Sequence, residues 1–278
     1  MDRKLHWLMS LAFIAVLLAG GVIGLGALTR LTDAGLGCPD WPGCYGHLSV
    51  PNTQQATQQA AVSFPHTVFV AQKAWTEMIH RYFAGTLGLL VIVIVLLGFF
   101  AASKYGVSYL ILSLLLLVML IYQVVLGMWT VTLKLWPQVV SGHLLGGFAT
   151  LSLLFLFTLR VFNPSKQKAS IDQPLLTPSH FSPWAVVGLV LVVVQVFLGA
   201  WTASNYAALA CPDFPTCQGE WWPNMNLQAG FNLFQAIGPN YLGGVMDSES
   251  RVAIHMVHRI GALLLTAYLV LMSWRLWH

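Results

Sequence analysis

Long apolar runs, separated by short polar segments, dominate the sequence. Six runs are long enough to cross a bilayer, which takes about 20 residues of helix. They cover residues 7–28, 77–102, 107–130, 138–162, 183–203 and 252–275. Arg3 and Lys4 precede the first run as they would in a signal peptide, but its apolar part is longer than the about 7–15 residues of a signal core. We therefore predict an all-α, polytopic transmembrane protein with an uncleaved first span.

Composition and charge agree with this class. The chain is 57% hydrophobic and 8% charged, with a mean hydropathy of +0.73, which excludes an ordinary soluble domain. The net charge of +4 comes from scattered residues that flank the apolar runs, so it does not indicate a nucleic acid partner. One side of the predicted membrane carries Arg3, Lys4, Lys104, Arg160, Lys166, Lys168 and Arg275, and the other carries Arg30, Lys73, Lys134 and Arg251. The richer side should be cytoplasmic, which places the N-terminus inside.

The two long outer loops carry one motif twice. Residues 37–46 read GCPDWPGCYG and residues 210–219 read ACPDFPTCQG. The offset is 173 positions from Cys38 to Cys211 and again from Gly26 to Gly199, and it is 178 from His80 to His258. Four spans separate equivalent points, and an even number preserves orientation. The pattern predicts tandem parallel four-helix-bundle repeats.

The repeat fixes the expected domain boundaries. We predict a first four-helix unit over 1–162, a cytoplasmic linker over 163–182 and a second unit over 183–278. The repeat partner of His143 would lie near position 321 (143 + 178), beyond His278. Eight spans are thus expected and six are present, so we expect the second unit to be incomplete. The likeness of residues 123–130 to residues 195–202 is interpreted as close helix packing.

Three histidines inside the spans are candidate ligands. His80 and His143 each lie a few residues into a span that runs inward, so at about 1.5 Å per residue they reach similar depths. Two imidazoles at one depth can bind a heme iron from opposite sides. His258 lies at the equivalent depth of the last span. The alternatives are hydrogen bonds between helices and zinc, which lacks a third and fourth ligand at this depth.

Charged residues flank two of these histidines. Glu77 precedes His80 by about one helical turn, and its repeat equivalent is His255. An acid beside a heme can relay protons during an oxidation; the alternative is an acid at the start of a helix, stabilised by the helix dipole. Arg81 and Arg259 are candidate contacts of heme propionates, or they extend to the membrane interface.

The four cysteines form two short pairs. Cys38 precedes Cys44, and Cys211 precedes Cys217, in loops that we predict to be external. A local disulfide in each loop is the simplest interpretation in an oxidising compartment. A redox-active thiol relay is the alternative.

These motifs resemble the heme A synthase family, in its bacterial form with loop cysteine pairs. The resemblance rests on residues 26–42 (GALTRLTDAGLGCPDWP), on Glu77-x-x-His80-Arg81, on residues 129–138 (WTVTLKLWPQ) and on residues 143–147 (HLLGG), and it extends over essentially the whole chain. It implies eight helices in two four-helix bundles. It also implies a membrane oxidoreductase that oxidises a methyl group of heme O to the formyl group of heme A, for terminal oxidase biogenesis.

The resemblance also assigns roles to residues and partners. It implies that Glu77, His80 and His143 form the site of the substrate heme O, and that His258 is one axial ligand of a cofactor heme b. It places the chain in the bacterial plasma membrane, with heme O synthase as supplier of substrate and an unidentified membrane electron donor. A homo-oligomer is one of the states left open. The alternative function is a non-catalytic, cytochrome b-like electron carrier with bis-His ligation. A transporter would need more polar residues at the bilayer midplane than these spans contain.

Overall fold

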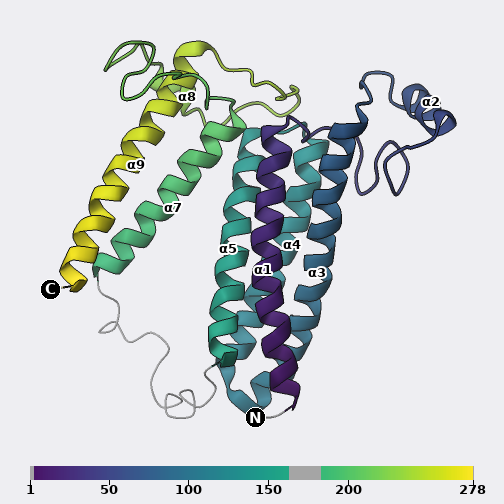
Figure 1. Ribbon diagram of the computed structural model, residues 1–278, viewed down its shortest axis with the longest axis vertical. Coiled ribbons are helices and arrows are strands. Elements are labelled where there is room, and N and C mark those ends of the chain that lie inside the picture. Colours follow the sequence, from purple (N-terminus) through teal and green to yellow (C-terminus); the bar gives the residue numbers. More distant parts are fainter. Residues whose placement is uncertain (1–2, 163–182, 278) are drawn as a thin grey trace. The chain divides into compact units, whose positions relative to one another are not determined.

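A computed structural model describes residues 3–162 and 183–277, which form helices joined by loops (Figure 1). Among the described residues, six helices are long and apolar enough to cross a membrane: α1 (Arg3–Leu31), α3 (Ala71–Tyr105), α4 (Val107–Thr132), α5 (Pro137–Phe162), α7 (Pro183–Ser204) and α9 (Ser248–Trp277). Two shorter helices, α2 (Gln54–Ser63) and α8 (Leu227–Gly230), lie in the long loops. Within these two ranges no strand forms beyond an isolated bridge in each cysteine loop. The predicted all-α, polytopic membrane fold is confirmed; the predicted linker 163–182 lies outside the described residues.

The described residues form two compact units. One contains 3–132 and 146–162, and the other contains 133–145 and 183–277. The start of α5 therefore belongs to the second unit and the rest of this helix to the first. The predicted domain boundaries and the predicted pair of further helices stay predictions.

The first unit is a bundle of four helices around one apolar core (Figure 1). Its buried residues come from α1, α3, α4 and α5, and they include Ala12, Ala15, Ile94, Leu116 and Phe157. The small side chains of α1 let neighbouring helices approach closely, which is how helices associate in lipid. The second unit is built differently: α7 packs against α9, and α8 packs against the start of α9.

Three helices begin several residues before their apolar runs. The hydropathy pattern predicts starts at 7, 77 and 252, whereas α1 begins at Arg3, α3 at Ala71 and α9 at Ser248. Asp247 caps α9, because its carboxylate accepts a hydrogen bond of 2.7 Å from the backbone N–H of Ser250. The added turns are polar, so hydropathy does not reveal them. As a result Glu77 lies inside α3 and not in its first turn.

Candidate functional site

The imidazole of His80 lies against the backbone of α1 at Gly26. A Cβ added at Gly26 would stand 3.1 Å from Cε1 and 3.6 Å from Nδ1 of the ring. Any residue larger than glycine would therefore push the ring out of its position. The backbone carbonyl of Val22 is a hydrogen-bond neighbour of the same imidazole. Nδ1 is buried without a hydrogen-bond partner. A buried polar atom of this kind requires an explanation, and a group that is absent from the structure is one.

His258 repeats this arrangement in the second unit. A Cβ added at Gly199 would stand 3.3 Å from Cε1 and 3.8 Å from Nε2 of the ring. Gly26 and Gly199 are the glycines that the sequence repeat pairs, so each unit has the same contact between a glycine and an imidazole. His258 has one further neighbour: the side-chain nitrogen of Gln195 on α7 lies 3.0 Å from its Nδ1.

His143 lies near the start of α5, in the part of this helix that belongs to the second unit. The loop between α7 and α9 fixes this part. The indole N–H of Trp136 donates to the carbonyl of Gln235 at 3.0 Å, and the hydroxyls of Ser141 and Ser204 share a hydrogen bond of 3.2 Å. Because His80 and His143 belong to different units, their pairing on one iron stays a prediction.

Glu77 joins α3 to the first cysteine loop. Glu77 is buried, with only 4% of its surface exposed to solvent. Oε2 accepts a hydrogen bond of 2.8 Å from the backbone N–H of Cys38, and Oε1 forms an ion pair with Arg81. The helix dipole acts mainly within the first turn, and α3 begins at Ala71. The alternative that Glu77 is a helix-terminal acid is therefore wrong.

Arg81 and Arg259 anchor the two cysteine loops, a role that the sequence interpretation missed. Arg81 donates to the carbonyls of Gly43 and Asp40 at 2.6 and 3.0 Å. Arg259 donates to the carbonyl of Thr216 at 2.8 Å. The available signal was that a His-Arg pair follows the cysteine motif in both repeats. The predicted contacts with heme propionates stay predictions.

The two cysteine loops have the same local structure. The predicted pairs form disulfides, Cys38 with Cys44 and Cys211 with Cys217, with Cα atoms 4.7 and 4.6 Å apart. Each loop also has a cis X–Pro bond, Trp41–Pro42 and Phe214–Pro215.

An aspartate organises each loop. Asp213 accepts hydrogen bonds from the hydroxyl of Thr216 and from the backbone N–H groups of Gln218 and Gly219. These bonds, that of Thr216 foremost, lower the pKa of the Asp213 carboxyl to about 2. Because this pKa lies below its ordinary value, the stabilisation is present at neutral pH and is lost only as the pH falls through about 2.

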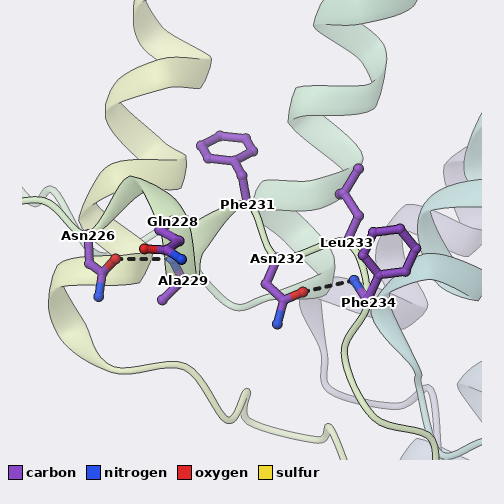
Figure 2. Close-up of a pocket in the computed structure, with 7 residues that line it drawn as sticks. All are labelled: Asn226, Gln228, Ala229, Phe231, Asn232, Leu233 and Phe234. Atoms are coloured by element: carbon purple, nitrogen blue, oxygen red, sulfur yellow. Dashed lines mark hydrogen bonds between the residues drawn. The ribbon is translucent and has the colours of Figure 1, made fainter.

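A hollow of about 570 Å³ opens beside α8, apart from these residues (Figure 2). Its lining consists of Asn226, Gln228, Ala229, Phe231, Asn232, Leu233 and Phe234. Two of the amides already serve local turns, since Asn226 accepts from the N–H of Ala229 and Asn232 from the N–H of Phe234. The lining has no titratable side chain, so we assign no chemistry to this hollow.

As candidate ligands, the histidines lie singly and not within a metal cluster of the described residues. In the part of the chain that the structure describes, no three His, Cys, Asp or Glu side chains gather as ligands of a metal ion. A porphyrin supplies four nitrogens of its own, so a heme needs only one or two protein ligands. The glycine that faces each ring, Gly26 at His80 and Gly199 at His258, fits such a group.

Comparison with known proteins identifies the family. Residues 9–278 match the family described as cytochrome oxidase assembly protein. The heme A synthase of Shewanella oneidensis is 45% identical over 98% of this chain and 79% of its own length. That of Shouchella clausii is 26% identical over 98% of this chain and 75% of its own, and that of Halalkalibacterium halodurans is 24% identical over 80% and 67%. The resemblance predicted from the motifs is confirmed: the chain belongs to the heme A synthase family of cytochrome oxidase assembly proteins.

Proposed function

We propose that this protein is a heme A synthase, an oxidoreductase that converts a methyl group of heme O into the formyl group of heme A. The observation that carries the proposal is the imidazole that faces a glycine in each unit, in a chain 45% identical to a relative with that name. With water as the source of oxygen, CH₃ and H₂O give CHO, four protons and four electrons. An external acceptor must then take the electrons.

His80 and His143 are the proposed ligands of the substrate iron. The close approach of the His80 ring to Gly26 supports this assignment for α3. His143 lies near the start of α5, and hydrogen bonds of Trp136 and Ser141 fix this part of the helix. Ligands on helices fixed in this way keep a substrate in one orientation, which is a large part of catalysis.

Glu77 is the proposed proton relay. A carboxylate offers about four lone-pair sites, and Cys38 and Arg81 each occupy one. The remaining capacity can take up a proton as the methyl group loses hydrogen. Glu77 lies about one helical turn before His80, so both side chains are on one side of α3.

His258 is the residue that would hold the iron of a resident heme b. The fit rests on the space at Gly199 and on the polar contact with Gln195. Such a cofactor, when bound, supplies one-electron transfer. The protein's part is to hold the imidazole in place and to set the polarity around it.

The proposed setting is the bacterial plasma membrane, with a cytoplasmic N-terminus and external cysteine loops. The disulfide in each loop supports an oxidising compartment on that side. Heme O synthase is the proposed supplier of substrate. The electron partner and a homo-oligomeric state remain open parts of the proposal.

The test is expression of the full chain in bacteria that make heme O but no heme A. We expect chromatography of the extracted hemes to show heme A or hydroxylated intermediates. A cytochrome b-like electron carrier would yield heme b and unchanged heme O, and that result would contradict the proposal.

Gly26→Ala should weaken binding of the substrate heme, because the new Cβ would stand 3.1 Å from the His80 ring and displace it. We expect about a tenfold or larger drop in heme O retained per purified protein, as for lost orientation of a metal ligand. Gly24→Ala is the control, since a Cβ there meets no atom within 4 Å. Equal retention by the two variants would show that the contact between Gly26 and His80 has no part in binding.

A further inference from the structure

We propose that Gln195 is a positioning residue for His258. With iron on Nε2, the side-chain oxygen of Gln195 accepts the hydrogen bond of the Nδ1–H group and fixes the tautomer that the iron needs. This inference rests on the proposed function, which makes His258 a heme b ligand. It adds a residue to which neither the motifs nor the family match gives a role.

The side chain of Gln195 reaches from α7 to α9. Its nitrogen lies 3.0 Å from Nδ1 of His258 and 3.0 Å from the backbone carbonyl of the same residue. Its oxygen, Oε1, is buried with no hydrogen-bond partner in the described residues. Gly261 makes room for the amide, because a Cβ there would stand 2.4 Å from Oε1. The amide nitrogen thus has hydrogen-bond partners, whereas the amide oxygen has none.

The tautomer of the ring decides which amide atom should face it. A neutral imidazole has one N–H donor and one acceptor nitrogen. Iron on Nε2 takes the lone pair there, so the proton must sit on Nδ1 and needs an acceptor. The amide nitrogen of Gln195 can only donate, which suits a ring without iron, whose Nδ1 still carries its lone pair.

A half-turn of the amide meets the demand of the iron-bound ring. It brings Oε1, the atom without a partner, to Nδ1–H, and the two amide ends are similar in size. The bond from the amide nitrogen to the His258 carbonyl is given up, and the amide must shift away from that carbonyl, because two oxygens at 3.0 Å would repel each other. That carbonyl still accepts the helical hydrogen bond from the backbone N–H of the next turn, because α9 continues to Trp277.

The first unit has no side-chain amide at the equivalent position. The residue equivalent to Gln195 is Val22 (195 − 173), and only its backbone carbonyl is a neighbour of His80. The side-chain amide therefore distinguishes the His258 site from the His80 site, although both share the glycine contact.

The test compares Gln195→Leu with Gln195→Glu in the full chain. Both are placed in a His80→Leu background, so that heme b does not occupy the proposed substrate site. The probes are the heme b content of the purified protein, its rate of heme loss to a heme-scavenging protein, and its midpoint potential. Gly188→Ala is the matched control, because a Cβ there presses on Tyr268 of α9 at 3.2 Å without facing His258.

We expect Gln195→Leu to weaken heme b binding about 10- to 100-fold and to raise the midpoint potential, since the ligand loses its acceptor and donates less charge to iron. Gln195→Glu should keep heme b and lower the potential, because an acidic acceptor makes the imidazole a stronger donor. Gly188→Ala should change neither quantity.

Two outcomes are distinguishable failures. If both Gln195 variants match Gly188→Ala, or shift the potential in the same direction, Gln195 only packs and this inference is wrong while His258 remains a ligand. If the parent protein with Gln195 intact holds no heme b, the assignment of His258 fails, and this inference fails with it.

Discussion

Glu77→Gln is expected to stop heme A formation while heme O stays bound. Glutamine keeps the shape of the side chain, and its amide oxygen can still accept the hydrogen bond from the N–H group of Cys38. It cannot exchange a proton near neutral pH. General acid–base catalysis contributes about 100- to 10,000-fold, so the yield of heme A should fall by about 100-fold or more, measured by chromatography of hemes from the purified protein.

Glu249→Gln is the control for this substitution, because Glu249 is an exposed acid in the first turn of α9. It should form heme A at the wild-type level. The structure also offers a purely mechanical role for Glu77, the connection of α3 to the first cysteine loop. In that case Glu77→Gln would lose bound heme O together with heme A. Unchanged heme A formation would rule out Glu77 as a proton relay.

His258→Leu is expected to remove heme b from the protein. A leucine offers no lone pair to iron, so heme b per protein should fall at least tenfold, measured from the pyridine-complex spectrum of the extracted pigment. Formation of heme A should fall with it, although heme O remains bound. His255→Leu is the matched control on the same helix, because Nδ1 of His255 is already engaged with the carbonyl of Ala207 at 2.9 Å.

The informative quantity is the difference in heme b content between His258→Leu and His255→Leu. We expect His255→Leu to keep heme b within about twofold of the wild type, since only the contact with Ala207 is lost. Equal heme b in both variants would show that His258 is not the ligand. Equal loss in both would show that α9 as a whole, and not one imidazole, determines binding.

The spans could be predicted from the sequence because bilayer thickness sets the length of an apolar run. All six predicted spans match helices of the structure. The polar first turns of α3 and α9 could not be predicted in this way, because Gln72 and Lys73, like Glu249, resemble loop residues in hydropathy. This error is the reason that a helix-terminal acid was an alternative interpretation of Glu77, which lies inside the helix.

The residues of the candidate site could be predicted where a polar or ionisable side chain stands within an apolar run. An imidazole inside an apolar run is conspicuous, and the repeat drew attention to Gly26 and Gly199, which face the rings of His80 and His258. Contacts to the backbone were not predictable. The anchoring of the loops by Arg81 depends on carbonyl groups that every residue has.

The central claim is that His80 and His143 hold the iron of heme O. Its most direct test is the heme content of wild-type protein and of a His80→Leu, His143→Leu double variant, purified from cells that make heme O. The account predicts heme O or its oxidised products together with heme b in the wild type, and heme b alone in the double variant. Heme O or heme A at the wild-type level in the double variant would contradict it.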